Sequence, residues 1–283
     1  MTDKEGILIA DSGSTKTAWI YVSNENRKNY LTEGANPFFR NTNDLIKEWK
    51  STSIGHLPSI VAEIYFYAAG VVNSERAMVI KKALQHFFPK AIIEVESDLL
   101  AAAHGTLGRE SGIACILGTG SNSCRYNGKA ITAHVPPLGF ILGDEGSGAV
   151  LGRQLIGDFL KKVMPENLRV SFQNEYTYSY AEILNRVYRE SKPNMFLAQF
   201  TPFIKQHIHH NYCEQLVEGA FDSFIQRNVA QYDGYDKEKI SFAGSIAYYF
   251  EAQLKKVLSK KNLHLGTIVK EPIEGLVNYH TKF

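Results

Sequence analysis

The chain has 283 residues, which exceeds the usual size of one domain, so we expect two domains. Its composition, 44% hydrophobic and 21% charged, is that of a globular protein able to bury a sizeable core. The formal net charge of +2 is too small to indicate nucleic acid or an anionic membrane surface as a partner.

The N-terminal part of the chain predicts three strands followed by an alternation of helices and strands. Strands are expected over residues 6–10, 17–22, 30–33, 64–69 and 91–95, and helices over 42–50, 74–88 and 98–104. The first two strands form a hairpin that turns through Gly13 and Ser14, and Ser74 is the expected N-cap of the second helix. This order implies a mixed sheet with helices on its faces.

The same pattern restarts near Gly112. Strands are expected over 112–117, 122–126, 129–133, 240–242 and 264–269, and helices over 145–162, 179–191, 213–231, 246–258 and from 272 onward. Asn127-Gly128 marks a second hairpin turn. The restart is the best domain boundary, so we expect one domain over 1–110 and a second over 111–271.

The three cysteines are odd in number and lack Cys-x-x-Cys spacing, which argues against a disulfide framework or a structural metal site. Acidic residues stand near the N-terminus, where a secretory signal would carry positive charge. The longest apolar region, residues 60–72, is interrupted by Glu63 and is too short to span a bilayer. We therefore expect a cytoplasmic protein without membrane contact.

Small-residue loops follow three of the expected strands. They are Asp-Ser-Gly-Ser-Thr-Lys-Thr (11–17), Gly-Thr-Gly-Ser-Asn-Ser (118–123) and Phe-Ala-Gly-Ser (242–245). Such turns expose backbone N–H groups and permit close approach by a bulky anion. None is a Walker A motif, and the first two join strand to strand, so hairpin N–H groups would hold the phosphate.

Asp11 ends the first expected strand, beside the first loop. Its carboxylate would repel a phosphate unless a cation lay between them, and hydrated Mg²⁺ takes carboxylate and phosphate oxygens. Ser14, Thr15 and Lys16 would then face the terminal phosphates. The alternative is that this segment is only a tight turn.

Two aspartates stand at positions where a carboxylate can contact a substrate: Asp98 follows the expected strand 91–95, and Asp144 precedes a long expected helix. Asp98 opens a helix and can take a proton from a sugar hydroxyl, or it can serve as the N-cap of that helix. Asp144 lies in the polar, glycine-rich segment 143–148. It can accept hydrogen bonds from substrate hydroxyls, or it can cap the following helix with Glu145 in the first turn.

Other polar residues suit structural roles better than ligand binding. Asn36, in the turn 34–37, can reach a ligand, although a turn asparagine is more often structural. His207, His209 and His210 invite a metal interpretation, but their spacing is poor for one helical face and favours a solvated surface.

Taken in order, the loops resemble the motifs of the sugar kinase, heat-shock and actin superfamily. The first and second loops are similar to its two phosphate motifs, and 243–245 is similar to its adenosine motif. The segments 96–98 (Glu-Ser-Asp), 118–122 and 143–147 (Gly-Asp-Glu-Gly-Ser) resemble more narrowly the N-acetylglucosamine kinase branch of the BadF/BadG-type ATPases. The resemblance covers essentially the whole chain.

The resemblance implies two ribonuclease-H-like domains of α/β class, each a mixed five-stranded sheet with flanking helices, around an ATP cleft. It implies that the C-terminal helix, 272–283, completes the first domain. ATP and Mg²⁺ are the implied cofactors, and a small-molecule sugar is the implied substrate. A dimer is common in the family, so a homodimer stays open.

The resemblance also assigns roles to individual residues. Asp98 is implied as the general base that acts on the sugar 6-hydroxyl. The residues assigned to the ATP phosphates and Mg²⁺ are Asp11, Gly13, Ser14, Thr15, Lys16, Gly118, Thr119 and Gly120. The adenosine is assigned to Gly244 and Ser245, and the sugar to Asn36, Asn122, Gly139 and Asp144.

The implied activity is ATP-dependent phosphorylation of an amino sugar, with N-acetylglucosamine converted to N-acetylglucosamine 6-phosphate. N-acetylmuramate or another sugar as the acceptor stays open, and so does a BadF-type ATPase that activates a partner enzyme. Activators of that type bind an iron–sulfur cluster between subunits through cysteines. Cys115 and Cys124 flank the second loop instead, and Cys115 lies inside an apolar strand, which weakens that interpretation.

Overall fold

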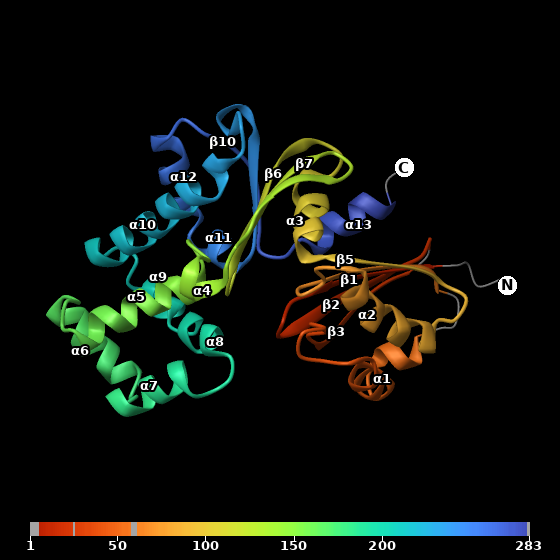
Figure 1. The fold of residues 1–283 in the computed structure, drawn as a ribbon, viewed down its shortest axis with the longest axis horizontal. Coiled ribbons are helices and arrows are strands. Elements are labelled where there is room, and N and C mark those ends of the chain that lie inside the picture. Colours follow the sequence, from red (N-terminus) through yellow and green to blue (C-terminus); the bar gives the residue numbers. More distant parts are fainter. Residues whose placement is uncertain (1–5, 25, 58–60, 282–283) are drawn as a thin grey trace. The chain divides into compact units, whose positions relative to one another are not determined.

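The computed structural model describes residues 6–24, 26–57 and 61–281 (Figure 1). The chain forms two compact units: unit 1 consists of the described parts of Met1–Arg109 and Pro272–Phe283, and unit 2 of Glu110–Glu271. Each unit is built on one mixed sheet of five strands, which confirms the predicted α/β class. Among the described residues, no helix combines the length and apolar character needed to cross a membrane.

The sheet of unit 1 has the strand order β3-β2-β1-β4-β5. Its strands are β1 (Gly6–Ser12), β2 (Lys16–Val22), β3 (Arg27–Glu33), β4 (Val61–Ala68) and β5 (Ile92–Ser97). The first three strands are antiparallel neighbours, whereas β4 and β5 continue the sheet in parallel with β1. The predicted first hairpin is confirmed, because Ser12 pairs with Thr17 across the turn.

Helices cover both faces of this sheet (Figure 1). They are α1 (Thr42–Lys50), the short η1 (Ser53–His56), α2 (Ser74–Phe87), α3 (Asp98–Leu107) and α13 (Ile273–Thr281). Since side chains alternate along a strand, Leu8 and Ala10 pack with Trp49 of α1, whereas Ile9 packs with Leu276 of α13. The N-cap of α2 is Asn73, so the prediction of Ser74 is wrong by one residue.

The sheet of unit 2 repeats this topology with the strand order β10-β9-β6-β7-β8. Its strands are β6 (Ser111–Leu117), β7 (Ser121–Asn127), β8 (Ile131–Val135), β9 (Lys239–Ala243) and β10 (His264–Val269). Again three antiparallel strands are followed by two parallel ones. The predicted restart of the pattern near Gly112 thus corresponds to a second copy of the same sheet.

Unit 2 carries more helices than unit 1 within the described residues. They are α4 (Gly139–Leu142), α5 (Gly148–Leu160), α6 (Glu166–Glu175), α7 (Tyr180–Tyr188), α8 (Pro193–Ala198), α9 (Thr201–Gln206), α10 (Asn211–Arg227), η2 (Val229–Gln231), η3 (Tyr235–Lys237), α11 (Ser245–Tyr249) and α12 (Glu251–Lys260). The single helix predicted over 246–258 is wrong, because Phe250, with φ −109° and ψ 28°, separates α11 from α12.

Tyr67 of β4 ties α3 to α13 within unit 1. Its hydroxyl oxygen lies 2.8 Å from Nδ1 of His104 and 2.8 Å from Nε2 of His280. Because the hydroxyl has one proton, it donates to one imidazole and accepts from the other. Burial lowers the pKa of both histidines to about 4, so both rings are neutral at pH 7 and can share the hydroxyl in this way.

We expect Tyr67→Phe to lower the free energy of unfolding by about 1–3 kcal/mol, because two buried ring nitrogens lose their shared partner. Urea unfolding followed by far-ultraviolet circular dichroism measures this change. Tyr188→Phe is the matched control, since that ring is 75% exposed, and it should change stability by less than about 0.5 kcal/mol. Equal effects of the two substitutions would contradict a structural role for the bridge.

Candidate functional site

The turn between β1 and β2 is an exposed hairpin tip. A hydrogen bond from the Gly13 N–H to the Lys16 carbonyl oxygen, 3.0 Å long, closes it. The backbone N–H groups of Ser14 and Thr15 donate to no acceptor among the described residues. Asp11 precedes the tip on β1. The tip therefore offers consecutive N–H donors beside a carboxylate, a combination suited to a phosphate and its cation.

The chain that leaves β3 packs directly on this tip. A Cβ atom at Gly34 would lie 2.4 Å from the carbonyl oxygen of Gly13, so the two backbones touch. Asn36 is 7% exposed and donates from Nδ2 to Ser14 Oγ at 3.0 Å. Its Oδ1 accepts from the Phe38 N–H at 2.9 Å. Asn36 thus lies on the loop, and each end of its amide already has one structural partner.

Asp98 is the first residue of α3, directly after β5. The carboxylate accepts hydrogen bonds from its own backbone N–H and from that of Leu99, which lower its pKa, but partial burial has the larger effect and raises the pKa. Strands β1, β4 and β5 are parallel neighbours, so their carboxyl ends lie at one edge of the sheet. The hairpin tip and Asp98 therefore belong to the same edge of unit 1.

The second hairpin tip, residues 118–120, is held by the N-terminus of α5. The N–H groups of Gly148 and Ala149 donate to the carbonyl oxygens of Gly118 and Thr119, at 2.8 and 3.0 Å. Within the tip the Gly118 N–H donates to the Gly120 carbonyl oxygen at 2.9 Å. The N–H groups of Thr119 and Gly120 meet no acceptor in the described part of the chain, so this tip resembles the first one.

Asp144 lies against this tip in a left-handed backbone conformation, with φ 53°. Its Oδ1 accepts from the Ser121 N–H at 3.3 Å, and a Cβ atom at Gly120 would lie 3.1 Å from its Oδ2. Asp144 is only 9% exposed. This burial, together with the neighbouring Glu145, raises its pKa to about 6, although the hydrogen bond from Ser121 opposes the shift.

Neither aspartate serves as a helix cap. Ser97 is the N-cap of α3 and Ser147 is the N-cap of α5, and each side chain accepts from the backbone N–H three residues further on, at 3.2 Å. The capping alternative is therefore wrong for both Asp98 and Asp144. The helix predicted from residue 145 begins at residue 148 for the same reason.

Asn122 is oriented by a residue that the sequence analysis missed. Its Oδ1 accepts from the Ser123 N–H and from Nε2 of His134, both at 2.9 Å. The Nδ2 of Asn122 has no partner among the described residues, so it can donate to a ligand. The sequence did contain a signal for His134. The Asn127-Gly128 turn predicts a hairpin of β7 and β8, and this pairing sets His134 opposite Cys124, two residues from Asn122 on β7.

The turn that follows β9 packs on the second tip. Gly244 has φ +119°, and a Cβ atom there would lie 2.3 Å from the carbonyl oxygen of Leu117, so only glycine fits. Ser245 follows it as the first residue of α11. Gly139, at the start of α4, has φ +72° and is exposed, and a Cβ atom at that position would have no other atom within 4 Å.

Each unit thus gathers one set of the residues predicted from the sequence. Unit 1 brings together the first tip and Asn36, with Asp98 at the same sheet edge. Unit 2 brings together the second tip, Asp144 and the Gly244 turn, with Asn122 on the strand that leaves the tip.

Two of the three histidines considered for a metal, His207 and His210, have local partners. His210 is the N-cap of α10 and accepts from the Tyr212 N–H at 3.1 Å, and His207 lies 3.4 Å from Ser171 Oγ. Among the described residues, no group of three or more histidine, cysteine, aspartate or glutamate side chains is arranged to hold a metal ion.

Comparison with known proteins gives matches to solved structures. A candidate N-acetylglucosamine kinase of Porphyromonas gingivalis is 44% identical, with a TM-score of 0.92 over 97% of this chain and 98% of that one. A candidate N-acetylglucosamine kinase of Chromobacterium violaceum is 17% identical, with a TM-score of 0.74 over 98% and 99%. A candidate N-acetylmannosamine kinase of Listeria monocytogenes is 16% identical, with a TM-score of 0.53 over 97% and 98%. No family model and no curated protein matches the chain.

We expect Gly244→Ala to lower the free energy of unfolding by about 3 kcal/mol or more, because it combines a strained φ with a backbone clash. Gly157→Ala is the matched control in the same unit, since no atom lies within 4 Å of a Cβ at that helical position. The control should be neutral or stabilising by up to about 1 kcal/mol. If thermal or urea unfolding shows equal stabilities, the close contact between the Gly244 turn and the second tip is wrong.

Proposed function

Because this chain belongs to the family of N-acetylglucosamine kinase-like proteins, within the sugar kinase, heat-shock and actin superfamily, we propose that it phosphorylates the 6-hydroxyl of N-acetylglucosamine. The chain is an ATP-dependent sugar kinase, since it shares 44% identity with its Porphyromonas gingivalis relative over nearly the whole of both chains. The observation that supports the sugar-phosphorylation step best is Asp98, a carboxylate at the strand edge that no helix cap uses.

The two hairpin tips suit the phosphates of ATP. Each has two consecutive N–H groups without an acceptor in the described residues, and such donors bind phosphate oxygens. In unit 1 the N–H groups of Ser14 and Thr15 would donate to the phosphates, with Gly13 and Lys16 beside them. In unit 2 the N–H groups of Thr119 and Gly120 would do so, next to Gly118, with Gly244 and Ser245 at the adenosine. Asp11 would hold Mg²⁺, which neutralises charge on the phosphate oxygens when bound.

The sugar is assigned to side chains that have spare hydrogen-bonding capacity. Asp144 has an Oδ2 turned toward Gly120, and a carboxylate oxygen can accept from a sugar hydroxyl. Asn122 has its Nδ2 available as a donor. Asn36 retains a second N–H on Nδ2, and Gly139 allows a ligand to approach the backbone.

Asp98 would orient the acceptor hydroxyl and take its proton as the bond from the sugar oxygen to the γ-phosphorus forms. The bond from the γ-phosphorus to the β–γ bridging oxygen of ATP breaks in the same transfer, and ADP leaves. Its raised pKa brings it closer to neutral pH, where a general base is most effective. Phosphoryl transfer depends mainly on positioning and charge stabilisation, which the phosphate loops would supply. The proton transfer to Asp98 would be an additional contribution to the rate.

We expect Asp98→Asn to lower kcat for sugar phosphorylation by at least about 10²-fold, the scale of a lost general base, while the affinity for ADP stays within about twofold. A coupled assay of ADP release measures the rate, and calorimetry measures ADP binding. Glu75→Gln is the matched control, because it makes the same change in the first turn of another helix of unit 1. Near-normal turnover in the Asp98 variant would show that Asp98 is not the base.

We expect the affinity for N-acetylglucosamine to fall as the pH is lowered through about 6, because a protonated Asp144 accepts fewer hydrogen bonds from sugar hydroxyls. Since the ionised form binds, Kd should rise about tenfold for each pH unit below 6 and stay constant above 7. Calorimetry without nucleotide measures this dependence separately from Asp98 chemistry. Asp144→Asn should bind weakly at every pH, and a pH-independent Kd in the wild-type protein would contradict the assignment.

A further inference from the structure

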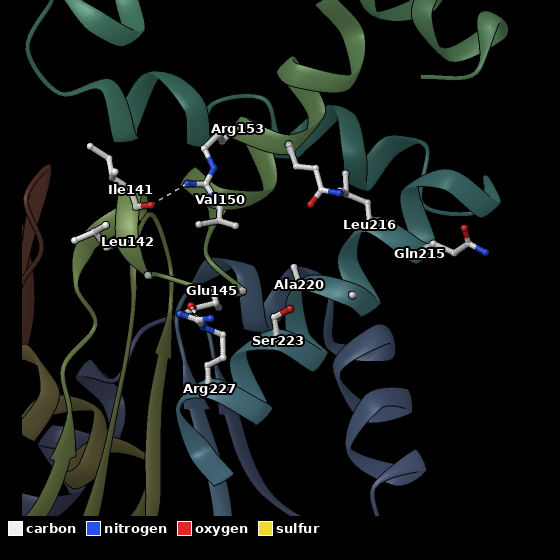
Figure 2. A pocket seen from close by; sticks show the side chains of 14 residues that line it. Ile141, Leu142, Glu145, Val150, Arg153, Gln215, Leu216, Ala220, Ser223 and Arg227 are labelled. Carbon is white, nitrogen blue, oxygen red and sulfur yellow. Dashed lines mark hydrogen bonds and ion pairs between the residues drawn. The ribbon is translucent and has the colours of Figure 1, made fainter. Parts of the chain in front are cut away.

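A groove of about 540 Å³ opens in unit 2 between α5, α10 and the segment 141–146 (Figure 2). This volume lies within the range of pockets that hold small metabolites. None of the residues assigned above to ATP, Mg²⁺ or the sugar lines it. Gly143, Glu145 and Gly146 of its wall flank Asp144, so the groove adjoins a sugar residue but is lined by side chains to which the proposed kinase reaction gives no role.

The charged residues that line the groove are two arginines and one glutamate. Arg227, on the last turn of α10, pairs through Nε with Glu145, and Arg153 of α5 donates from Nη1 to the Phe140 carbonyl oxygen at 2.6 Å. A guanidinium group has five N–H donors, so each arginine keeps several that meet no acceptor in the described part of the chain. Figure 2 shows both guanidinium groups turned toward the segment 141–145.

The ion pair with Glu145 fixes the Arg227 side chain but uses only some of its N–H donors. Its partner Glu145 is only 16% exposed, whereas the Arg227 side chain is 63% exposed. Asn228 donates to the other oxygen of Glu145 at 3.2 Å, which fixes that carboxylate. The ion pair therefore anchors the Nε side of the guanidinium and leaves its Nη groups accessible, as a preorganised anion site requires.

The uncharged residues of the lining suit a ligand group that carries hydroxyls and no charge. Val150, Leu216 and Ala220 supply apolar surface, and Gln154, Gln215 and Ser223 supply amide and hydroxyl groups. Gly219 leaves open space, because no atom lies within 4 Å of a Cβ there. A sugar ring has apolar faces and hydroxyl edges that match such a surface, and a phosphate group matches the arginines.

We propose that this groove is a second ligand site, which binds a phosphorylated sugar through Arg153 and Arg227. The phosphate oxygens accept charge-assisted hydrogen bonds from the guanidinium groups, and the sugar ring lies along Val150, Leu216 and Ala220. A free phosphate shares the anionic group but lacks the ring, so the two ligands differ in affinity.

The test is titration of the ¹⁵N-labelled full chain, without nucleotide, with N-acetylglucosamine 6-phosphate, inorganic phosphate or N-acetylglucosamine. The sugar phosphate should shift the backbone amide signals of Gly219 and Ser223, and inorganic phosphate should shift them with at least about tenfold weaker affinity. The unphosphorylated sugar should leave these signals unchanged. Equal affinities for sugar phosphate and inorganic phosphate would overturn the sugar component of the proposal.

Arg153→Gln and Arg227→Gln should each raise the Kd read from Gly219 and Ser223 about tenfold, the effect of one charge-assisted hydrogen bond. Arg189→Gln is the matched control, since Arg189 lies in unit 2 outside the groove and loses the same charge. Arg227→Lys should fall between wild type and Arg227→Gln. No shift at Gly219 and Ser223 in the wild-type protein, or an equal loss in the Arg189 variant, would overturn the site.

Because this readout measures binding within unit 2, it does not depend on catalysis by Asp98. The Asp98→Asn variant should keep the groove affinity even if it loses kinase activity. If the wild-type protein shows kinase activity but no binding of sugar phosphate at Gly219 and Ser223, this inference alone is rejected. If it binds sugar phosphate there but phosphorylates no sugar, the proposed function alone is rejected.

Discussion

Backbone packed directly on backbone at the two hairpin tips is the constraint on which the candidate site depends. In unit 1, Gly34 lies against Gly13, and in unit 2, Gly244 lies against Leu117. Such contacts leave no room for a Cβ atom at Gly34 or Gly244, so glycine is needed in the supporting turn that packs on each tip. Each tip is thereby held from one side, while the N–H groups at its other side stay available to an anion.

The two candidate aspartates lie beside helix starts that serine side chains cap. Ser97 and Ser147 are the N-caps of α3 and α5, so neither aspartate is an N-cap, although the Asp98 carboxylate accepts from the N–H groups of Asp98 and Leu99. Burial then raises the pKa of Asp98, and burial raises that of Asp144 to about 6. A carboxylate that no cap uses, and whose pKa is raised, can bind a hydroxyl or accept its proton.

The sequence could predict the sheets and the loops because their signals are local. Short apolar runs end in Gly/Ser/Thr turns, and the Asn127-Gly128 turn fixes a hairpin without reference to the rest of the chain. The repeated order of strands followed from these runs, and both sheets confirm it. The exact N-caps escaped prediction, because Asn73 and Ser97 each stand beside a residue that also caps well, and Asp144 stands three residues before Ser147.

Features that depend on contacts between distant segments could not be predicted from the sequence. The break at Phe250 divides a continuous helical pattern, and its ring is fully buried in the core of unit 2. The groove beside Arg153 and Arg227 arises where α5 meets α10, which are separated by 50 residues of chain between Leu160 and Asn211.

The central claim is that the chain transfers the γ-phosphate of ATP to the 6-hydroxyl of N-acetylglucosamine. The most direct measurement is ³¹P nuclear magnetic resonance of the products formed with ATP, Mg²⁺ and each of N-acetylglucosamine, N-acetylmannosamine, N-acetylmuramate and glucose. We predict a phosphomonoester at oxygen 6 of N-acetylglucosamine, formed with one ADP for each sugar and with the highest kcat/KM of the four. Formation of ADP and inorganic phosphate at a rate that no sugar increases would contradict the account.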